Sequence, residues 1–233
     1  MKIGLCGFPK SRKKIYEEFD VVEIQKSFYT PISEETGKRY RKEAPQNFEF
    51  SVKALQVITH PHNSPTYRRY KGDIPINENV GFFKNTKEVF DGWEITRKFA
   101  KALDAKVIVF QCPSKFKEND ENIKNMYGFF ESIEREFIFG WEPRGKWSEE
   151  TIKKICEDLN LIHVVDPFKN NKLHGDFAYY RLHGIGGYKY KYSDDDLRKL
   201  AEIVEKNDYV LFNNVYMYDD AKRFKEIVKN RKL

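Results

Sequence analysis

The sequence Phe137-Ile138-Phe139-Gly140-Trp141-Glu142-Pro143-Arg144 is an apolar run that ends in two charged residues. Its apolar part has the length and composition of a strand that is buried on both faces. Because residues two apart on a strand point to the same side, Glu142 and Arg144 share one face. A charged side chain is costly to bury without a partner, so the pattern indicates a polar site at the end of this strand.

A second run has the same form: Tyr180-Arg181-Leu182-His183-Gly184 follows an apolar segment and places Arg181 and His183 on one face. Similar runs predict eight strands, at residues 2–8, 21–28, 48–55, 106–112, 137–141, 161–165, 177–182 and 209–213. Helices are predicted between most of them, at residues 33–44, 93–104, 121–133, 148–159, 193–206 and 218–230. The helical pattern is weak at residues 12–19, and residues 169–175, after the sixth strand, predict a loop.

Eight strands that alternate with helices predict an α/β fold, a single TIM-type (β/α)8 barrel in which some helices are short or missing. We expect one domain over residues 1–233. A doubly wound open sheet is the alternative. Such a sheet usually has a Gly-rich phosphate loop after its first strand, and Gly7-Phe8-Pro9-Lys10 lacks that pattern.

One connection is unusually long, at residues 56–92 after the third strand. Long loops in compact domains are often lids or binding loops. This one carries His60, Arg68 and Arg69 among aromatic residues, a mixture typical of a lid that contacts a phosphate or a nucleic-acid strand. An ordinary solvated surface loop is the equally weighted alternative.

The composition gives a mild basic bias, with 42 Lys and Arg against 36 Asp and Glu and a net charge of +6. This bias is compatible with an anionic ligand or nucleic acid, but also with a surface of interleaved Lys and Glu. Three cysteines without close spacing argue against a disulfide framework and for a reducing compartment. No apolar run approaches the roughly 20 residues of a membrane helix. We therefore expect a cytoplasmic protein without a membrane segment.

A barrel of this type has its site at the carboxyl ends of its strands. The polar residues predicted at those ends are Glu23, Gln25, Lys53, Gln111, Glu142, Arg144, Asp166, Arg181, His183, Asn213 and Asn214. Glu142 and His183 are the candidate catalytic residues, because a partly desolvated carboxylate and an imidazole both transfer protons near neutral pH. Each of the two residues could instead have a purely structural role. For Glu142 that role would be an ion pair with Arg144 or Arg181.

The candidate substrate-binding residues are Glu23, Lys53, Gln111, Arg144, Asp166, Arg181, Asn213 and Asn214. Arginines suit a bidentate hold on phosphate or carboxylate. Lys53 would bind an anion or pair with Glu23, or form a Schiff base if it is buried. The histidines, among them His60, His62 and His163, lack the spacing of strong metal motifs, so we expect no metal and no cofactor.

The same segments resemble the YecE-like proteins, a family classed as domain of unknown function 72. The resemblance covers nearly the whole chain and is carried by residues 3–8, 22–29, 50–54 with Thr59-His60, 110–113, 142–144 with Trp147, 180–184 and 212–214. It implies a TIM-type barrel, and its motifs coincide with the polar residues at the strand ends. It implies no particular reaction.

Three functions are compatible with these residues. The favoured one is an enzyme, a hydrolase or lyase, that acts on a small phosphate-like or sugar-phosphate-like anion by acid–base chemistry at the barrel mouth. The second is a nucleic-acid-binding protein, with or without phosphodiester cleavage. The third is a barrel that binds a ligand without turnover. Fold alone does not separate them.

Overall fold

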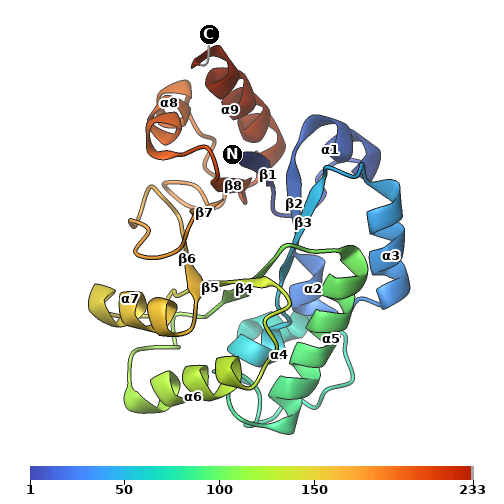
Figure 1. Ribbon diagram of the computed structural model, residues 1–233, viewed down its shortest axis with the longest axis vertical. Helices are drawn as coiled ribbons and strands as arrows, with labels where there is room; N and C mark the ends of the chain where they lie inside the picture. The colour runs from blue at the N-terminus through green and yellow to red at the C-terminus, as the bar shows by residue number, and fades with distance from the viewer. Residues whose placement is uncertain (232–233) are drawn as a thin grey trace.

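The computed structural model describes residues 1–231, which form a closed eight-stranded barrel (Figure 1). Its strands are β1 (Lys2–Leu5), β2 (Val21–Ile24), β3 (Glu49–Lys53), β4 (Val107–Gln111), β5 (Ile138–Glu142), β6 (Leu161–Val165), β7 (Tyr179–Leu182) and β8 (Tyr209–Phe212). Each strand pairs in parallel with the next, and β8 closes onto β1 with Tyr209 opposite Lys2. The TIM-type barrel is therefore confirmed, and closure excludes the open doubly wound sheet.

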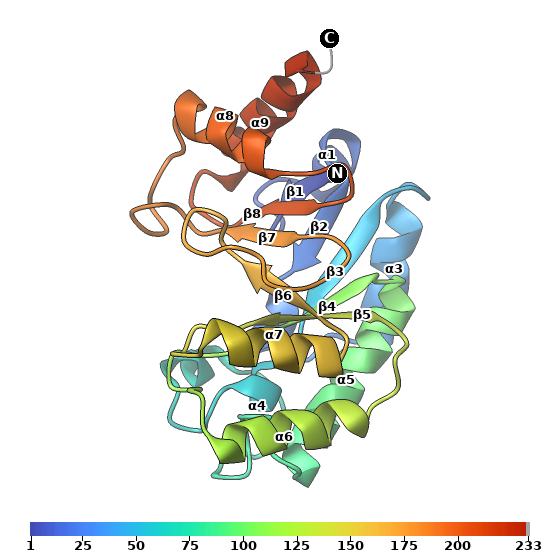
Figure 2. The same ribbon diagram turned by 60° about the vertical axis from the view of Figure 1, so that its left-hand side comes forward.

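Helices surround the barrel on its outside (Figures 1 and 2). They are α1 (Arg12–Glu18), α2 (Lys26–Tyr29), α3 (Glu34–Glu43), α4 (Gln56–Thr59), α5 (Lys87–Leu103), α6 (Asp120–Glu131), α7 (Glu149–Asp158), α8 (Asp194–Ile203) and α9 (Met217–Arg231), with a 3-10 helix, η1 (Pro65–Arg69). Within residues 1–231 the segment between β6 and β7 contains no helix, as predicted. In Figure 2 the arrows of β6 and β7 point toward the side where the loop before α8 lies, which is the mouth of the barrel.

The strand predicted at residues 2–8 ends at Leu5, and two further predicted boundaries are wrong. The strand predicted at residues 21–28 ends at Ile24, because the next residues turn into α2 and Ser27 Oγ donates to the backbone oxygens of Ile24 and Lys53, at 2.7 Å each. The helix predicted from residue 93 begins at Lys87. Residues 56–92 are thus partly ordered into α4, η1 and the first turn of α5 rather than forming one plain loop.

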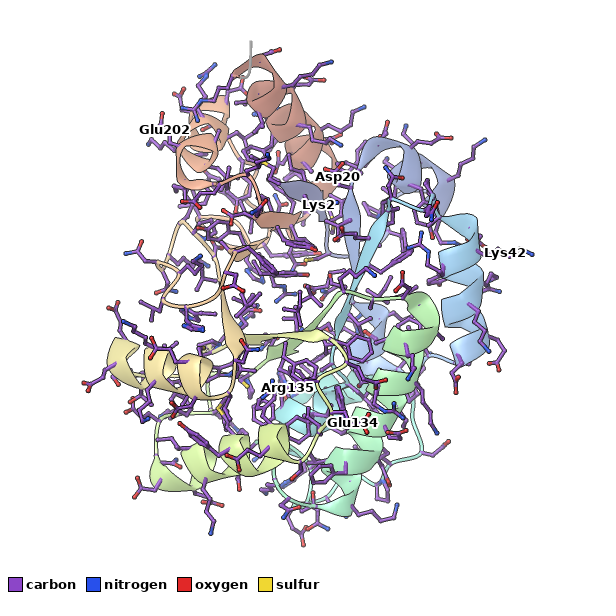
Figure 3. The ribbon with its side chains drawn as sticks, in the orientation of Figure 1. Lys2, Asp20, Lys42, Glu134, Arg135 and Glu202 are labelled. Carbon is purple, nitrogen blue, oxygen red and sulfur yellow. The ribbon has the colours of Figure 1, made fainter. Side chains whose placement is uncertain are left out.

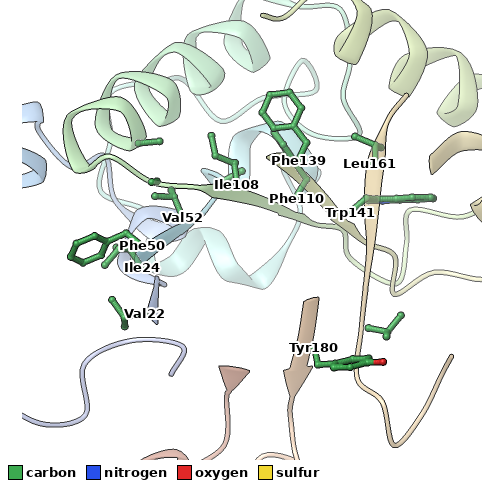
Figure 4. Packing of buried hydrophobic residues seen from close by; sticks show 14 of the residues in the cluster. Val22, Ile24, Phe50, Val52, Ile108, Phe110, Phe139, Trp141, Leu161 and Tyr180 are labelled. Carbon is green, nitrogen blue, oxygen red and sulfur yellow. The ribbon is translucent and has the colours of Figure 1, made fainter. Parts of the chain in front are cut away.

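The core has two layers separated by the sheet. Val107 and Val109 of β4 belong to a small apolar cluster inside the barrel. Ile108 and Phe110 alternate with them and pack in the larger cluster between the sheet and the helices, as Figure 4 shows. This alternation fixes which side of every strand faces the barrel axis. It therefore also determines which polar residues at the strand ends point into the mouth.

Charged side chains gather on the outer helices (Figure 3). Lys42 of α3 and Glu202 of α8 are exposed there and point away from the sheet. In the part of the chain that the structure describes, no helix is long and apolar enough to cross a membrane.

Helix α8 begins with a reciprocal cap. Ser193 Oγ accepts a hydrogen bond from the backbone nitrogen of Asp196 at 3.1 Å, and the Asp196 carboxylate accepts one from the Ser193 nitrogen at 2.9 Å. We expect Ser193→Ala to lower the free energy of unfolding by about 1 kcal/mol, because one helix-end donor loses its partner. Urea unfolding measures this, and Ser114→Ala at an exposed turn serves as the control. An equal effect of the two substitutions would contradict the prediction.

Candidate functional site

Five of the predicted polar residues converge inside the carboxyl end of the barrel. Lys53, Gln111 and Glu142 are the last residues of β3, β4 and β5. Glu23 and Arg181 each lie one residue before the end of β2 and β7. All five are buried, with at most 6% of the residue exposed. The inward face of the barrel therefore concentrates charge in a region with little access to water.

Arg181 lies at the centre of this cluster. Its side chain is fully buried, and Nη2 donates to Glu23 Oε1 at 2.9 Å while Nη1 donates to Glu142 Oε2. Burial by itself lowers the pKa of Arg181, but the two glutamates outweigh it and raise that pKa well above the ordinary value. Because a buried charge requires a partner, the two ion pairs of Arg181 hold β7 against β2, through Glu23, and against β5, through Glu142.

Glu23 has further support on the side of the barrel interior. Tyr179 donates its hydroxyl to Glu23 Oε2 at 2.9 Å, and the same hydroxyl lies 2.6 Å from Ser51 Oγ. The Gln25 amide donates to Oε1. Burial and the charge on Glu23 raise the pKa of Tyr179 well above its usual value, so the hydroxyl keeps its proton. Tyr179 and Ser51 were missed by the sequence prediction, although Tyr179 lies two residues before Arg181 and therefore shares its face.

Glu142 is held by two arginines. Its Oε1 accepts hydrogen bonds from Arg144 Nε at 3.1 Å and Nη2 at 3.0 Å, and its Oε2 accepts from Arg181. Burial raises the pKa of Glu142, but the charges of Arg181 and Arg144 outweigh burial and hold this pKa well below its usual range. The ion pairs that the sequence offered as a structural alternative are thus both formed, and Glu142 is ionised.

His183 lies beside Glu142 at the pocket surface. Its Nε2 lies 2.8 Å from Arg144 Nη2 and 3.8 Å from Glu142 Oε1. Since a guanidinium can only donate, Nε2 is the acceptor and the ring proton is on Nδ1. Nδ1 lies 3.8 Å from Asp166 Oδ2, which also accepts the backbone N–H of His183 at 3.1 Å. Burial lowers the pKa of His183 even though Asp166 opposes that shift. The imidazole is therefore neutral near pH 7, with Asp166 fixing its orientation.

Four of these side chains open onto one pocket at the barrel mouth, which we call the mouth pocket. It has a volume of about 520 Å³, and its lining includes Glu142, Arg144, Asp166 and His183. His163 of β6 also lines it, and burial lowers the pKa of His163 to about 4. The mouth pocket thus offers an ionised carboxylate, a neutral imidazole and a guanidinium to one ligand.

Lys53 does not form the ion pair with Glu23 that the sequence left open as one alternative. Glu23 is taken by Arg181 instead, while Lys53 Nζ donates to Gln111 Oε1 at 2.9 Å. The ammonium lies over the Phe28 ring, 3.7 Å from its centroid. Burial, followed by the charge on Arg181, lowers the pKa of Lys53 to about 7. The amine therefore exists partly in its neutral form near pH 7.

Asn213 and Asn214, which were predicted to bind substrate, are not among the residues that line the mouth pocket. Asn214 uses its amide within the fold, donating to the Tyr190 backbone oxygen at 2.8 Å and to Asp220 Oδ2 at 2.7 Å. Asn213 is half-buried after β8, and its backbone N–H donates to the Leu182 oxygen at 2.8 Å.

The predicted lid residues divide into two groups. His60 is buried edge-on against Phe28, its Nδ1 lies 2.8 Å from Thr59 Oγ1, and burial lowers its pKa to about 3. Arg68 and Arg69 are exposed on η1 and line a different pocket, beside α2. Within residues 1–231, no group of three or more His, Cys, Asp or Glu side chains is placed to hold a metal ion.

A closed parallel barrel with a polar site at the carboxyl ends of its strands defines the class of TIM-type barrel proteins. A sequence profile of the family described as "Protein of unknown function DUF72" matches residues 11–232. The chain belongs to the DUF72 family, which confirms the resemblance drawn from its motifs.

The relatives agree with this assignment. The UPF0759 protein YunF of Bacillus subtilis (strain 168) is 28% identical over 135 residues, which cover 52% of this chain and 43% of that protein. The match thus spans less than half of the length of that curated relative. A DUF72 family structure from Enterococcus faecalis V583 has a TM-score of 0.76 at 14% identity, over 98% of this chain and 95% of the other.

Two further solved structures share the fold. A DUF72 family protein from Thermotoga maritima MSB8 has a TM-score of 0.71 at 20% identity, over 97% of this chain and 98% of the other. SacUVDE has a TM-score of 0.65 at 10% identity, over 95% of this chain and 85% of its own. At these identities the likeness concerns the fold alone.

Proposed function

We propose that the protein is an enzyme that acts on a small anionic substrate, such as a phosphate ester or sugar phosphate, by acid–base catalysis in the mouth pocket. The observation that carries the proposal is the meeting of Glu142, His183 and Arg144 at one pocket of about 520 Å³. Each of these side chains faces open volume while a neighbouring side chain orients it. An enzyme that binds an anion and transfers a proton at the same place needs a cation and proton-transferring groups that are oriented toward one pocket.

Arg144 is the residue best placed to hold the anion. Its side chain is 43% exposed, whereas that of Arg181 is 0% exposed and already bonded to two carboxylates. Phosphate or carboxylate oxygens compete well for a guanidinium. An anion that draws Arg144 away from His183 would leave Nε2 free to accept a proton. Substrate binding and activation of the base are thereby coupled.

His183 and Glu142 then have separate roles. In a hydrolysis, His183 Nε2 accepts a proton from the attacking water and returns it to the leaving oxygen, while Asp166 stabilises the intervening imidazolium. Glu142 remains ionised, and its Oε1 at 3.8 Å from Nε2 stabilises the same positive charge. An elimination would use the same base on a C–H bond. Arg181 is a positioning residue that fixes Glu142.

Turnover of small phosphate compounds tests the proposal. We would assay p-nitrophenyl phosphate, bis(p-nitrophenyl) phosphate and a set of sugar phosphates. For any compound that is turned over, Glu142→Gln and His183→Asn are each expected to lower kcat/KM about 100-fold, because His183 transfers the proton and Glu142 stabilises the imidazolium that results. The matched control is His174→Asn, since His174 lies outside the mouth pocket.

The other outcomes are equally informative. Full activity in both variants would contradict the roles given to Glu142 and His183. Turnover of the diester alone would favour the phosphodiester-cleaving alternative. Tight binding of a compound without turnover would favour a ligand-binding barrel. Thermal unfolding of each variant shows whether a loss of activity is a loss of fold.

A further inference from the structure

A second pocket, of about 720 Å³, lies beside the barrel mouth, and we call it the basic pocket. It is enclosed by the segments that follow β1 and β2 and by the segment around η1. Its cationic lining residues are Lys26, Arg68, Arg69 and Lys71, and its aromatic ones are Phe8, Tyr29 and Tyr40. Among residues 1–231, no Asp or Glu lines it.

The four cations of the basic pocket lack acidic partners. All four are exposed, and within residues 1–231 none of them lies within 4.0 Å of a carboxylate oxygen. Elsewhere on the surface such pairs are common: Arg97 contacts Glu94 at 2.6 Å and Glu136 at 2.8 Å. Four like charges around one concave surface attract an anion, because nothing nearby neutralises them.

Part of the basic pocket is already organised for binding. The Arg69 guanidinium stacks on Tyr29, 3.8 Å from the ring centroid. The backbone N–H of Lys71 donates to the Tyr29 oxygen at 3.2 Å, which fixes the segment after η1 against α2. A side chain held in place loses less conformational freedom when a ligand binds. Arg69 is therefore the best-oriented anion donor of the four.

The aromatic residues suggest what the anion is attached to. Phe8 and Tyr40 are half-buried, with ring centroids 6.0 Å apart in an edge-to-face arrangement. Together with Tyr29 they give the basic pocket apolar faces beside its cations. Aromatic faces next to cations are the combination with which proteins bind a phosphate and a stacked planar ring.

The basic pocket also adjoins the charged cluster of the mouth. Gln25 lines the basic pocket and donates to Glu23. Arg181 joins Glu23 to Glu142, and Glu142 lines the mouth pocket. Contacts through Gln25, Glu23, Arg181 and Glu142 thus connect the linings of the two pockets.

We propose that the basic pocket binds a phosphate ester that carries a planar aromatic ring, the chemistry shared by a free nucleotide and a single strand of nucleic acid. The phosphate contacts Arg69, Arg68, Lys26 and Lys71, and the ring packs against the aromatic side chains. This goes beyond the proposed reaction, because the binding does not require proton transfer by Glu142 or His183.

Calorimetric titrations with adenosine 5′-monophosphate, adenosine and ribose 5-phosphate test the two halves of this ligand. We expect the nucleotide to bind at least about tenfold tighter than either fragment, since stacking on an aromatic side chain contributes about that factor. Arg68→Gln/Arg69→Gln should weaken the nucleotide at least tenfold. The matched control is Lys124→Gln/Lys206→Gln, which removes the same charge from exposed positions on α6 and before β8.

A labelled ten-nucleotide single strand identifies the source of the ligand. Binding at least tenfold tighter than the mononucleotide assigns the pocket to a strand. In that case the slope of log K against the logarithm of the salt concentration should become less steep by about 1.4 in the double-arginine variant, because two phosphate contacts are lost. Equal affinities assign it to a free nucleotide. No binding of any probe, equal affinity for nucleotide and ribose 5-phosphate, or equal effects of the arginine and lysine variants would overturn the proposal. Glu142→Gln should keep nucleotide affinity while losing turnover, which separates this proposal from that of catalysis.

Discussion

Replacing Arg181 with Met is expected to lower the free energy of unfolding by about 3–5 kcal/mol at pH 7. The substitution leaves Glu23 and Glu142 buried without the cation that both contact. Glu23 cannot be rehydrated in the folded state, since it is 0% exposed. Urea unfolding followed by tryptophan fluorescence measures the change.

Two further variants identify the cause of this loss. Arg181→Met/Glu23→Gln/Glu142→Gln removes the unpaired charges and should recover most of the lost stability. Arg198→Met removes an exposed pair, with Arg198 and Asp195 side chains 61% and 80% exposed, and should change stability by less than about 1 kcal/mol. A loss in Arg181→Met no larger than that of Arg198→Met would contradict the account of the charged cluster.

The strands could be predicted because their pattern is local. The strand predicted at residues 106–112 contains the continuous β-branched and aromatic run at residues 107–110, and β4 occupies Val107–Gln111. A strand covered on both faces needs such a run, whatever its neighbours are. The same reasoning placed Gln111 and Glu142 at strand ends, and the alternation of side chains placed them on the inward face.

The early start of helix α5 depends on contacts with residues that are distant in sequence. The spacing of Ile95, Phe99 and Leu103 predicted a helix from residue 93, directly after Gly92, a residue of low helix propensity. In the fold Gly92 lies against Val57 of α4, where there is no room for a side chain. The earlier turn is held by Val89, which is fully buried one turn before Trp93. Packing between α4 and α5 therefore outweighs the low helix propensity of glycine.

Side-chain contacts within the site could likewise be predicted only where the two residues are close in sequence. Glu142 and Arg144 lie two residues apart on one face, and their contact could be expected from spacing alone. The pairing of Arg181 with Glu23 joins residues 158 positions apart. Which inward side chains meet across a barrel depends on strand tilt and stagger, and these are set by closure of the whole sheet. For that reason the sequence left the partner of Lys53 open, with Glu23 among the alternatives, whereas in the structure Lys53 donates to Gln111.

Lys53 gives the second large effect. Burial and Arg181 lower its pKa to about 7, whereas a lysine in the unfolded chain titrates near 10.4. Between these values the unfolded chain binds more protons, so the free energy of unfolding rises with pH in that window. Below the window Lys53 is protonated in both states, so it adds no pH dependence there and its destabilising effect is fully present. Relative to Lys53→Met, the wild type should gain on the order of 4 kcal/mol between pH 7 and pH 10.

Urea unfolding at several pH values, compared between wild type and Lys53→Met, isolates this one titration because other groups cancel. Lys124→Met, at an exposed position on α6, is the control and should run parallel to the wild type. Parallel curves for Lys53→Met as well would mean that Lys53 keeps an ordinary pKa. A slope confined to pH 7–10 would instead identify an amine that is partly neutral at physiological pH and lies next to the mouth. An amine in that state can attack a carbonyl carbon, which would add Schiff-base chemistry to the reactions to be assayed.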